Sequence, residues 1–156
     1  MVMRYSVSEK ELVALAVELG GNLKSIGVIF LCGDLGVGKT TFVRGLLRGM
    51  GYLGNVKSPT YSLLESYHLA AGVCHHLDLY RLQAIDELDC LDIRDLLWGK
   101  DALLLIEWPE HALDGLPRPD LKVNINYSVN KREISFQPYT DTGDNMLSGL
   151  SFRGLI

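Results

Sequence analysis

The segment from Gly33 to Thr40 constrains the fold more than any other part of the chain. It reads Gly-Asp-Leu-Gly-Val-Gly-Lys-Thr, a match to the pattern G-x-x-x-x-G-K-[ST]. An apolar, partly β-branched run precedes it at residues 26–32, and residues 41–50 after it carry apolar side chains at helical spacing. A strand, a glycine-rich turn and a helix in this order bring backbone N–H groups onto phosphate oxygens at a helix N-terminus. The sequence therefore predicts a nucleotide-binding phosphate loop.

We expect every residue of this loop to contribute to nucleotide binding. In this pattern the lysine, here Lys39, reaches the β- and γ-phosphates, and the hydroxyl of Thr40 binds Mg²⁺. The nucleotide-binding residues predicted from the pattern are Gly33, Asp34, Leu35, Gly36, Val37, Gly38, Lys39 and Thr40. The segment 130–133, Asn-Lys-Arg-Glu, resembles the guanine-selecting N-K-x-D, but it ends in Glu and falls in a predicted hairpin turn. We therefore expect ATP with Mg²⁺ as the bound nucleotide.

Composition excludes several other classes of protein. The 156 residues suggest one domain, and 47% of them are hydrophobic, which is enough for a sizeable core. A net charge of −4 argues against a protein that binds nucleic acid such as DNA by itself, since such affinity comes largely from neutralised phosphates. The chain shows no N-terminal signal segment and no apolar run of about 18 residues, so we expect a cytoplasmic protein without a membrane partner. Cys32, Cys74 and Cys90 lie far apart, as expected of reduced thiols.

Periodicity predicts an α/β domain over residues 1–139, with a mixed sheet flanked by helices. A capping box at Ser8-Glu9-Lys10-Glu11 opens a helix that ends at Gly20-Gly21. Gly45 and Gly49 lie four apart in the helix after the phosphate loop, and we expect the face they share to pack closely against the sheet. The other predicted elements are a strand at 2–7, a hairpin at 61–80, a helix at 83–98 broken near 91–92, a strand at 102–107, and a C-terminal hairpin at 121–128 and 132–139.

Residues 140–156 follow this domain and differ from it in composition. They are rich in Gly, Ser and Asp, with scattered apolar residues. We expect a loosely docked or disordered tail.

Acidic residues end two of the apolar runs: Asp78 follows Leu77, and Glu107 follows Ile106. Ligands of open α/β sheets lie at the carboxyl ends of strands, so both carboxylates are candidates for a metal site. We expect Asp78 and Thr40 near the Mg²⁺ and Glu107 toward the attacking water, with Glu107 as metal ligand the alternative. Glu107 and Lys39 are the predicted catalytic residues. A carboxylate that only caps the next turn is the structural alternative.

A polar loop containing Ser58 and Thr60 follows the phosphate-loop helix. Such a loop can act as a switch that senses the γ-phosphate, or it can be an ordinary turn, and both interpretations stay open. His75 and His76 are not expected to form a metal site, because adjacent residues of a strand point to opposite faces.

Four blocks together resemble the TsaE (YjeE) family, the small phosphate-loop ATPases of bacterial tRNA threonylcarbamoyl-adenosine modification. The blocks are Gly33–Thr41, Ser58-Pro59-Thr60-Tyr61, His76-Leu77-Asp78-Leu79-Tyr80-Arg81-Leu82 and Leu105-Ile106-Glu107-Trp108-Pro109-Glu110. The phosphate loop alone is unspecific, whereas the last two blocks together are specific. In order and spacing the resemblance covers about residues 8–139. The departures, such as Val37 where alanine is expected, remove no functional group.

The resemblance implies a protein that binds ATP with Mg²⁺ and hydrolyses it weakly alone. It also implies stimulation by a partner complex, the threonylcarbamoyl-transferase TsaD with its paralogue TsaB, and contact with tRNA through that complex. By the motif match, Thr41 joins the nucleotide-binding residues and Trp108 flanks the site. Ser58 and Thr60 then form the switch-like element.

Two other functions fit a phosphate loop. A small-molecule kinase needs a basic lid and an acceptor-binding segment, but a hairpin stands between the phosphate-loop helix and the strand that ends in Glu107. A nucleotide-dependent assembly module, in which hydrolysis is incidental, remains an alternative.

Overall fold

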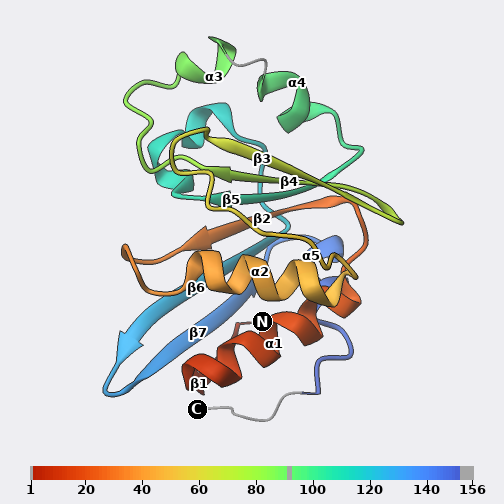
Figure 1. The fold of residues 1–156 in the computed structure, drawn as a ribbon, viewed down its shortest axis with the longest axis vertical. Coiled ribbons are helices and arrows are strands. Elements are labelled where there is room, and N and C mark those ends of the chain that lie inside the picture. The colour runs from red at the N-terminus through yellow and green to blue at the C-terminus, as the bar shows by residue number, and fades with distance from the viewer. Residues whose placement is uncertain (1, 91–92, 152–156) are drawn as a thin grey trace.

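The computed structural model describes residues 2–90 and 93–151, and these form a mixed β-sheet with helices on both faces (Figure 1). Within these residues the sheet has seven strands in the order β1-β7-β6-β2-β5-β4-β3. The strands are β1 Met3–Val7, β2 Gly27–Cys32, β3 Leu64–Leu69, β4 Gly72–Asp78, β5 Leu103–Glu107, β6 Leu121–Ser128 and β7 Lys131–Pro138. The helices are α1 Glu9–Asn22, α2 Lys39–Gly49, α3 Glu87–Cys90, α4 Ile93–Trp98 and α5 Asp141–Leu147. The predicted α/β fold is confirmed.

The centre of the sheet is parallel and its edges are antiparallel. β6, β2, β5 and β4 run in one direction, so their carboxyl ends meet at one edge of the sheet. β3 pairs antiparallel with β4, and β7 pairs antiparallel with both β6 and β1. Both predicted hairpins are therefore present. Any residue that directly follows β2, β4 or β5 is delivered to the same edge.

Alternate residues of the central strands enter two hydrophobic cores. Ile29 and Leu31 of β2 belong to the core beneath α1 and α2, whereas Phe30 belongs to the core that includes Ile93 and Leu97 of α4. The side chains of a strand alternate between faces, so a strand covered on both sides must be apolar at every position. This explains the continuous apolar sequence of β2 and β5.

Helices α1 and α2 pack directly against each other. The predicted capping box opens α1, where the Ser8 hydroxyl accepts from Glu11 N–H and the Glu11 carboxylate accepts from Ser8 N–H. Gly45 and Gly49 were expected to face the sheet, but they face α1: a Cβ on Gly49 would lie 2.1 Å from the Val17 carbonyl oxygen. Spacing showed that the two glycines share a face, but could not show which element covers it.

The described helices beyond α2 are short. The predicted helix at 83–98 is observed as α3 and α4, and residues 83–86 are not helical. The predicted break at Leu91 and Asp92 lies outside the described residues. No helix within residues 2–90 and 93–151 is long and apolar enough to cross a bilayer.

The described part of the tail differs from the expectation of a loosely docked segment. The Thr140 hydroxyl caps α5 by accepting from Gly143 N–H at 3.1 Å. Met146 and Leu147 are buried in the core beneath α1, and a Cβ on Gly143 would lie 1.9 Å from the Asp120 carbonyl oxygen. Met146 and Leu147 of the tail thus belong to a short helix that packs on the domain.

Candidate functional site

The phosphate-loop segment connects the carboxyl end of β2 to the start of α2. Gly33, Gly36 and Gly38 have φ angles of 148°, 79° and 121°, a range that residues with a Cβ rarely adopt. Gly38 precedes α2 and has no side chain to bind the first-turn N–H groups, so these donors and the positive end of the helix dipole face the loop. This is the backbone form of an anion-binding loop.

The side chain of Lys39 folds over this loop. Lys39 is 5% exposed, and its ammonium group donates to the carbonyl oxygens of Gly33 and Asp34. The same nitrogen lies 4.0 Å from the centre of the Trp108 ring. Burial lowers the pKa of Lys39, while the nearby carboxylates of Glu107 and Asp78 oppose that shift and favour the charged form.

The two predicted acids lie side by side at the carboxyl edge of the sheet. Asp78 ends β4 and Glu107 ends β5, and the two are paired in register. They are 6% and 2% exposed. The Thr40 hydroxyl donates to Glu107 Oε2 at 3.4 Å. The structure thus places a hydroxyl and two carboxylates around one point, as a metal–phosphate site requires.

A cavity of about 200 Å³ opens at this point. Its lining consists of Leu35, Gly36, Gly38, Lys39, Thr40, Thr41, Ser58, Thr60, Asp78, Glu107 and Trp108. All of these were predicted from sequence as site residues. Gly33, Asp34 and Val37 do not line the cavity: the Val37 side chain is buried in the core, and a Cβ on Gly33 would lie 2.3 Å from the Ile125 carbonyl oxygen.

The burial of two neighbouring acids affects the pKa of Asp78. Burial raises its pKa, and the neighbouring charge of Glu107 raises it further. A hydrogen bond from Tyr80 N–H to Asp78 Oδ1, at 3.0 Å, works in the opposite direction. Two buried carboxylates in neighbouring strands repel each other, and a cation placed between them would relieve that repulsion.

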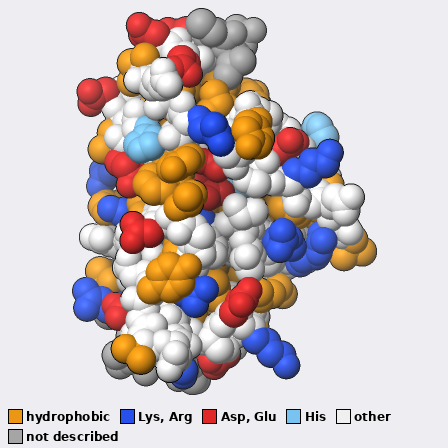
Figure 2. Space-filling view, turned by 60° about the vertical axis from the view of Figure 1, so that its left-hand side comes forward, with side chains coloured by type: hydrophobic (Ala, Val, Ile, Leu, Met, Phe, Trp, Pro, Cys, Tyr) orange, Lys and Arg blue, Asp and Glu red, His pale blue; other side chains and the backbone are white. Residues whose placement is uncertain are grey.

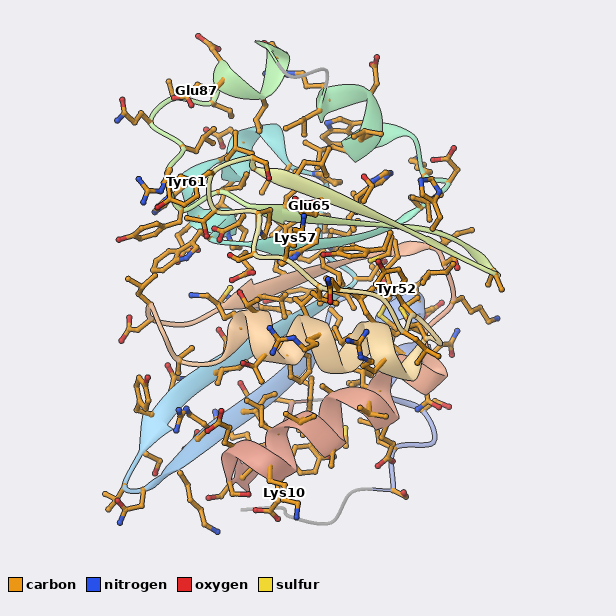
Figure 3. All side chains as sticks on the ribbon, viewed as in Figure 1. Lys10, Tyr52, Lys57, Tyr61, Glu65 and Glu87 are labelled. Atoms are coloured by element: carbon orange, nitrogen blue, oxygen red, sulfur yellow. The ribbon has the colours of Figure 1, made fainter. Side chains whose placement is uncertain are left out.

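The loop that precedes β3 reaches this cavity from the far end of α2. Figure 3 shows the chain returning across the sheet from Tyr52 through Lys57 to Tyr61, at the edge where the parallel strands end. Thr60 donates to Asp78 Oδ2 at 3.5 Å, and the Ser58 and Thr60 hydroxyl oxygens are 2.7 Å apart. The loop is thereby hydrogen-bonded to a carboxylate of the cavity.

His76 contacts the site, although it was not among the predicted site residues. Its Nε2 lies 2.6 Å from Glu107 Oε2, and both side chains are almost fully buried. Strand alternation was a usable signal, because His76 and Asp78 are two apart in β4 and so share a face. The contact itself depends on the register of β4 against β5. His75 points away from this face and contacts Ser66, as the alternation predicted.

Trp108 forms one wall of the cavity from an unusual backbone conformation. Its φ of 55° lies in the left-handed region, directly after β5. The ring packs against Tyr80, with 5.1 Å between ring centres, and against His111, with 5.4 Å. Figure 2 brings this edge of the sheet forward and shows hydrophobic side chains beside acidic and basic ones.

Two side chains of the β6–β7 hairpin also contact the phosphate loop, and sequence reasoning did not predict them. The Tyr127 hydroxyl donates to the Gly36 carbonyl oxygen at 2.8 Å, and Arg132 Nε donates to the Val37 carbonyl oxygen at 2.9 Å. Arg132 lies in the segment that resembles N-K-x-D. That segment is part of a hairpin, as expected, and this hairpin lies beside the phosphate loop.

Comparisons with known proteins identify relatives of this chain. The family model described as "Threonylcarbamoyl adenosine biosynthesis protein TsaE" matches residues 6–134. The chain is 46% identical over 124 residues to the tRNA threonylcarbamoyladenosine biosynthesis protein TsaE of Haemophilus influenzae, covering 80% of this chain and 78% of that protein. It is 33% identical over 132 residues to the protein of the same name from Bacillus subtilis, covering 84% and 82%.

A solved structure shows the same architecture. The crystal structure of YdiB from Bacillus subtilis superposes with a TM-score of 0.76 at 26% identity, covering 97% of this chain and 95% of that chain. The sequence matches and the structural match each cover most of this chain. The chain belongs to the TsaE family of threonylcarbamoyl adenosine biosynthesis proteins.

Proposed function

We propose that the protein binds ATP with Mg²⁺ at the carboxyl edge of the sheet and hydrolyses it, in support of tRNA threonylcarbamoyladenosine biosynthesis. The observation that carries this proposal is the meeting of Lys39, Thr40 and Glu107 at the phosphate loop. An ammonium group, a hydroxyl and a carboxylate at the end of the neighbouring parallel strand are the parts that phosphate-loop NTPases use. The family role supports the biological context.

The oxygen donors of the cavity fit Mg²⁺. This ion usually takes one or two carboxylates together with substrate phosphates and water. The described residues contain no group of three or more His, Cys, Asp and Glu side chains able to hold a metal ion. Thr40 and Glu107 would hold the ion jointly with the nucleotide phosphates, where it neutralises charge that develops on the phosphate oxygens.

The contact between Thr40 and Glu107 supports a division of labour between the acids that is the reverse of the one expected from sequence. Glu107 is bonded to the hydroxyl that binds Mg²⁺ in phosphate-loop proteins, so we assign it to the metal. Asp78 is bonded to Thr60 of the switch-like loop, and its raised pKa suits a group that accepts a proton from the attacking water. Lys39 offsets the negative charge of the transferred phosphoryl group.

A partner is needed to complete this site. None of the described residues that line the cavity is an arginine. Arg81, from the matched block, lies instead over the Tyr61 ring, 4.6 Å from its centre. Phosphate-loop NTPases gain several orders of magnitude in rate from an arginine finger. We propose that the TsaB–TsaD complex supplies or organises the missing group, and that tRNA is reached only through that complex.

The test follows the labelled γ-phosphate of ATP, with the protein alone and with the TsaB–TsaD pair. We expect slow release of inorganic phosphate alone and an increase of about tenfold or more with the pair. Label on a metabolite would indicate a kinase instead. Fast release by the protein alone, unchanged by the pair, would contradict the proposed dependence on a partner.

A further inference from the structure

A second cavity opens at the edge of the sheet opposite the phosphate loop. It lies where β2 and β5 begin, beside the end of α4 and the start of α5 (Figure 1), and its volume is about 360 Å³. Val28, Ala102 and Leu104, at the start of the two strands, form part of its apolar lining. Among the described residues none lines both this cavity and the candidate nucleotide site, so the two are separate.

This second cavity carries an excess of positive charge. The exposed side chains of Lys100 and Arg118 line it, and Lys24 lines an adjoining cavity of about 250 Å³ that shares Ile26 and Thr142 with it. Within residues 2–90 and 93–151 none of these three cations forms an ion pair. Cations gathered in a cleft with apolar walls attract anions.

The acid that lines the cavity does not neutralise these cations directly. Both carboxylate oxygens of Asp120 are already bonded, Oδ2 to Val28 N–H at 2.8 Å and Oδ1 to the Thr140 hydroxyl at 2.6 Å. Arg118 donates one hydrogen bond, to the Tyr139 carbonyl oxygen at 3.3 Å, and a guanidinium has five N–H donors. Donors of Arg118 therefore remain for a ligand.

An aromatic side chain stands beside the cations. Trp98 ends α4 and is 52% exposed, and its indole lines the same cavity as Lys100 and Arg118. The φ of Lys100 is 61°, in the left-handed region that glycine adopts without strain. An exposed indole and a guanidinium are both flat surfaces on which another ring can stack.

We propose that this cavity binds a small aromatic anion, a flat ring system that carries a carboxylate, sulfonate or phosphate group. The ring packs on Trp98 and the apolar residues at the strand starts, and the acidic group binds Lys100 and Arg118. The volume falls within the range of small-molecule sites, roughly 300–1,000 Å³. This inference does not rest on the proposed nucleotide-binding function, because the two cavities share no described residue.

The probe is anilinonaphthalene sulfonate, an aromatic monoanion that fluoresces in apolar sites, titrated with and without saturating ADP and Mg²⁺. We expect saturable binding at a single site, with an affinity that ADP leaves unchanged. The double variant Lys100→Gln, Arg118→Gln should bind about fivefold more weakly or worse, and Trp98→Ala about threefold or worse. Lys10→Gln, which replaces an exposed lysine of α1 (Figure 3), is the matched control and should keep the native affinity.

Phenylnaphthylamine, which has the same rings without the sulfonate, separates charge from packing. It should bind the native protein and the double variant alike, and lose affinity in Trp98→Ala. Equal losses of both probes in the double variant would show that the cavity itself was altered and would contradict the role of charge.

Three further results would overturn the inference: displacement of the sulfonate probe by ADP, native affinity in the double variant, or no saturable binding by the native protein. Circular dichroism of each variant establishes that the fold is retained.

Discussion

At the scale of single residues, the Glu107 carboxylate contacts two other side chains at the site. Its Oε2 accepts from the Thr40 hydroxyl at 3.4 Å and lies 2.6 Å from His76 Nε2. A hydrogen bond between these two atoms uses one shared proton. The other ring nitrogen of His76 is buried with no hydrogen-bond partner among the described residues. The hydrogen bond of His76 to the site is therefore the one to Glu107.

Replacing His76 should lower turnover more than substrate affinity. Groups that orient a metal ligand typically contribute about 10- to 100-fold to activity. We expect His76→Leu to reduce kcat by about tenfold or more, with KM for ATP within about threefold. His76→Gln, whose amide can donate to Glu107, should recover part of the loss. Steady-state kinetics with the TsaB–TsaD pair measure both, and equal losses in the Leu and Gln variants would contradict the positioning role.

Asp78 links function to stability. Its pKa in the folded protein is raised by burial and by Glu107, so the ionised form destabilises the ligand-free protein above that pKa. Asp78→Asn removes the charge and keeps an oxygen for Tyr80 N–H. We expect a higher Tm in the variant at neutral pH, by about 2–4 °C for each kcal/mol relieved.

The pH dependence of this gain has a definite sign. As pH falls through the folded-state pKa, the native carboxyl takes up a proton and the penalty disappears. The difference in Tm between Asp78→Asn and the native protein should therefore shrink from about pH 7 to about pH 4. Thermal unfolding of both proteins in the same buffers measures it. A constant or widening difference would show that burial of the Asp78 charge is not the cause.

At the scale of elements, α1 and α2 form a close pair that carries the phosphate loop at one end. Gly45 and Gly49 let the α2 backbone approach α1, since a Cβ on Gly45 would lie 2.6 Å from the Ala16 Cβ. Phe42 and Leu46 of α2 then reach the core of the sheet. The start of α2, and with it Lys39 and Thr40, is positioned by this packing.

Gly49→Ala should destabilise the protein although alanine favours a helix. The helix gains about 1 kcal/mol from the substitution. The new methyl would lie 2.1 Å from the Val17 carbonyl oxygen, and overpacking costs up to about 3 kcal/mol. We expect a net loss of about 2 kcal/mol in the free energy of unfolding, measured with urea.

Gly21→Ala is the matched control for this prediction. The nearest atom to a Cβ on Gly21, the Gly49 carbonyl oxygen, is 4.0 Å away. Gly21 lies in the last turn of α1, so the alanine should be neutral or slightly stabilising. Equal destabilisation by both substitutions would show that close approach of the helices is not responsible.

At the scale of the whole molecule, the order of the strands assembles the site from distant parts of the sequence. β2 lies between β5 and β6, so the phosphate loop has Glu107 on one side and Tyr127 on the other. Cores on both faces of the sheet fix β2 and β5. The site thus lies at the ends of two strands packed on both faces, and the loop of residues 57–61 runs beside it.

Features formed by neighbouring residues could be predicted from sequence, whereas contacts between distant residues could not. Three features depend only on residues adjacent in the sequence: the phosphate loop, the capping box at Ser8 and the acids at strand ends. The structure places them as expected. The contact of His76 with Glu107 depends on strand register, and that of Tyr127 with Gly36 on which strand lies beside β2. No local pattern encodes either. The helix in the tail was missed because its seven residues carry only two large apolar side chains, Met146 and Leu147, too few to show a helical period.

The most direct test of the account is the Mg²⁺ dependence of ADP binding in the native protein, Glu107→Gln and Asp78→Asn, measured by calorimetry. Native protein should bind ADP more tightly with Mg²⁺ than without it. Glu107→Gln should lose that gain, because Glu107 is assigned to the metal beside Thr40. Asp78→Asn should keep it. A gain that persists in Glu107→Gln and disappears in Asp78→Asn would contradict the assignment of the two acids, and no ADP binding by the native protein would contradict the site itself.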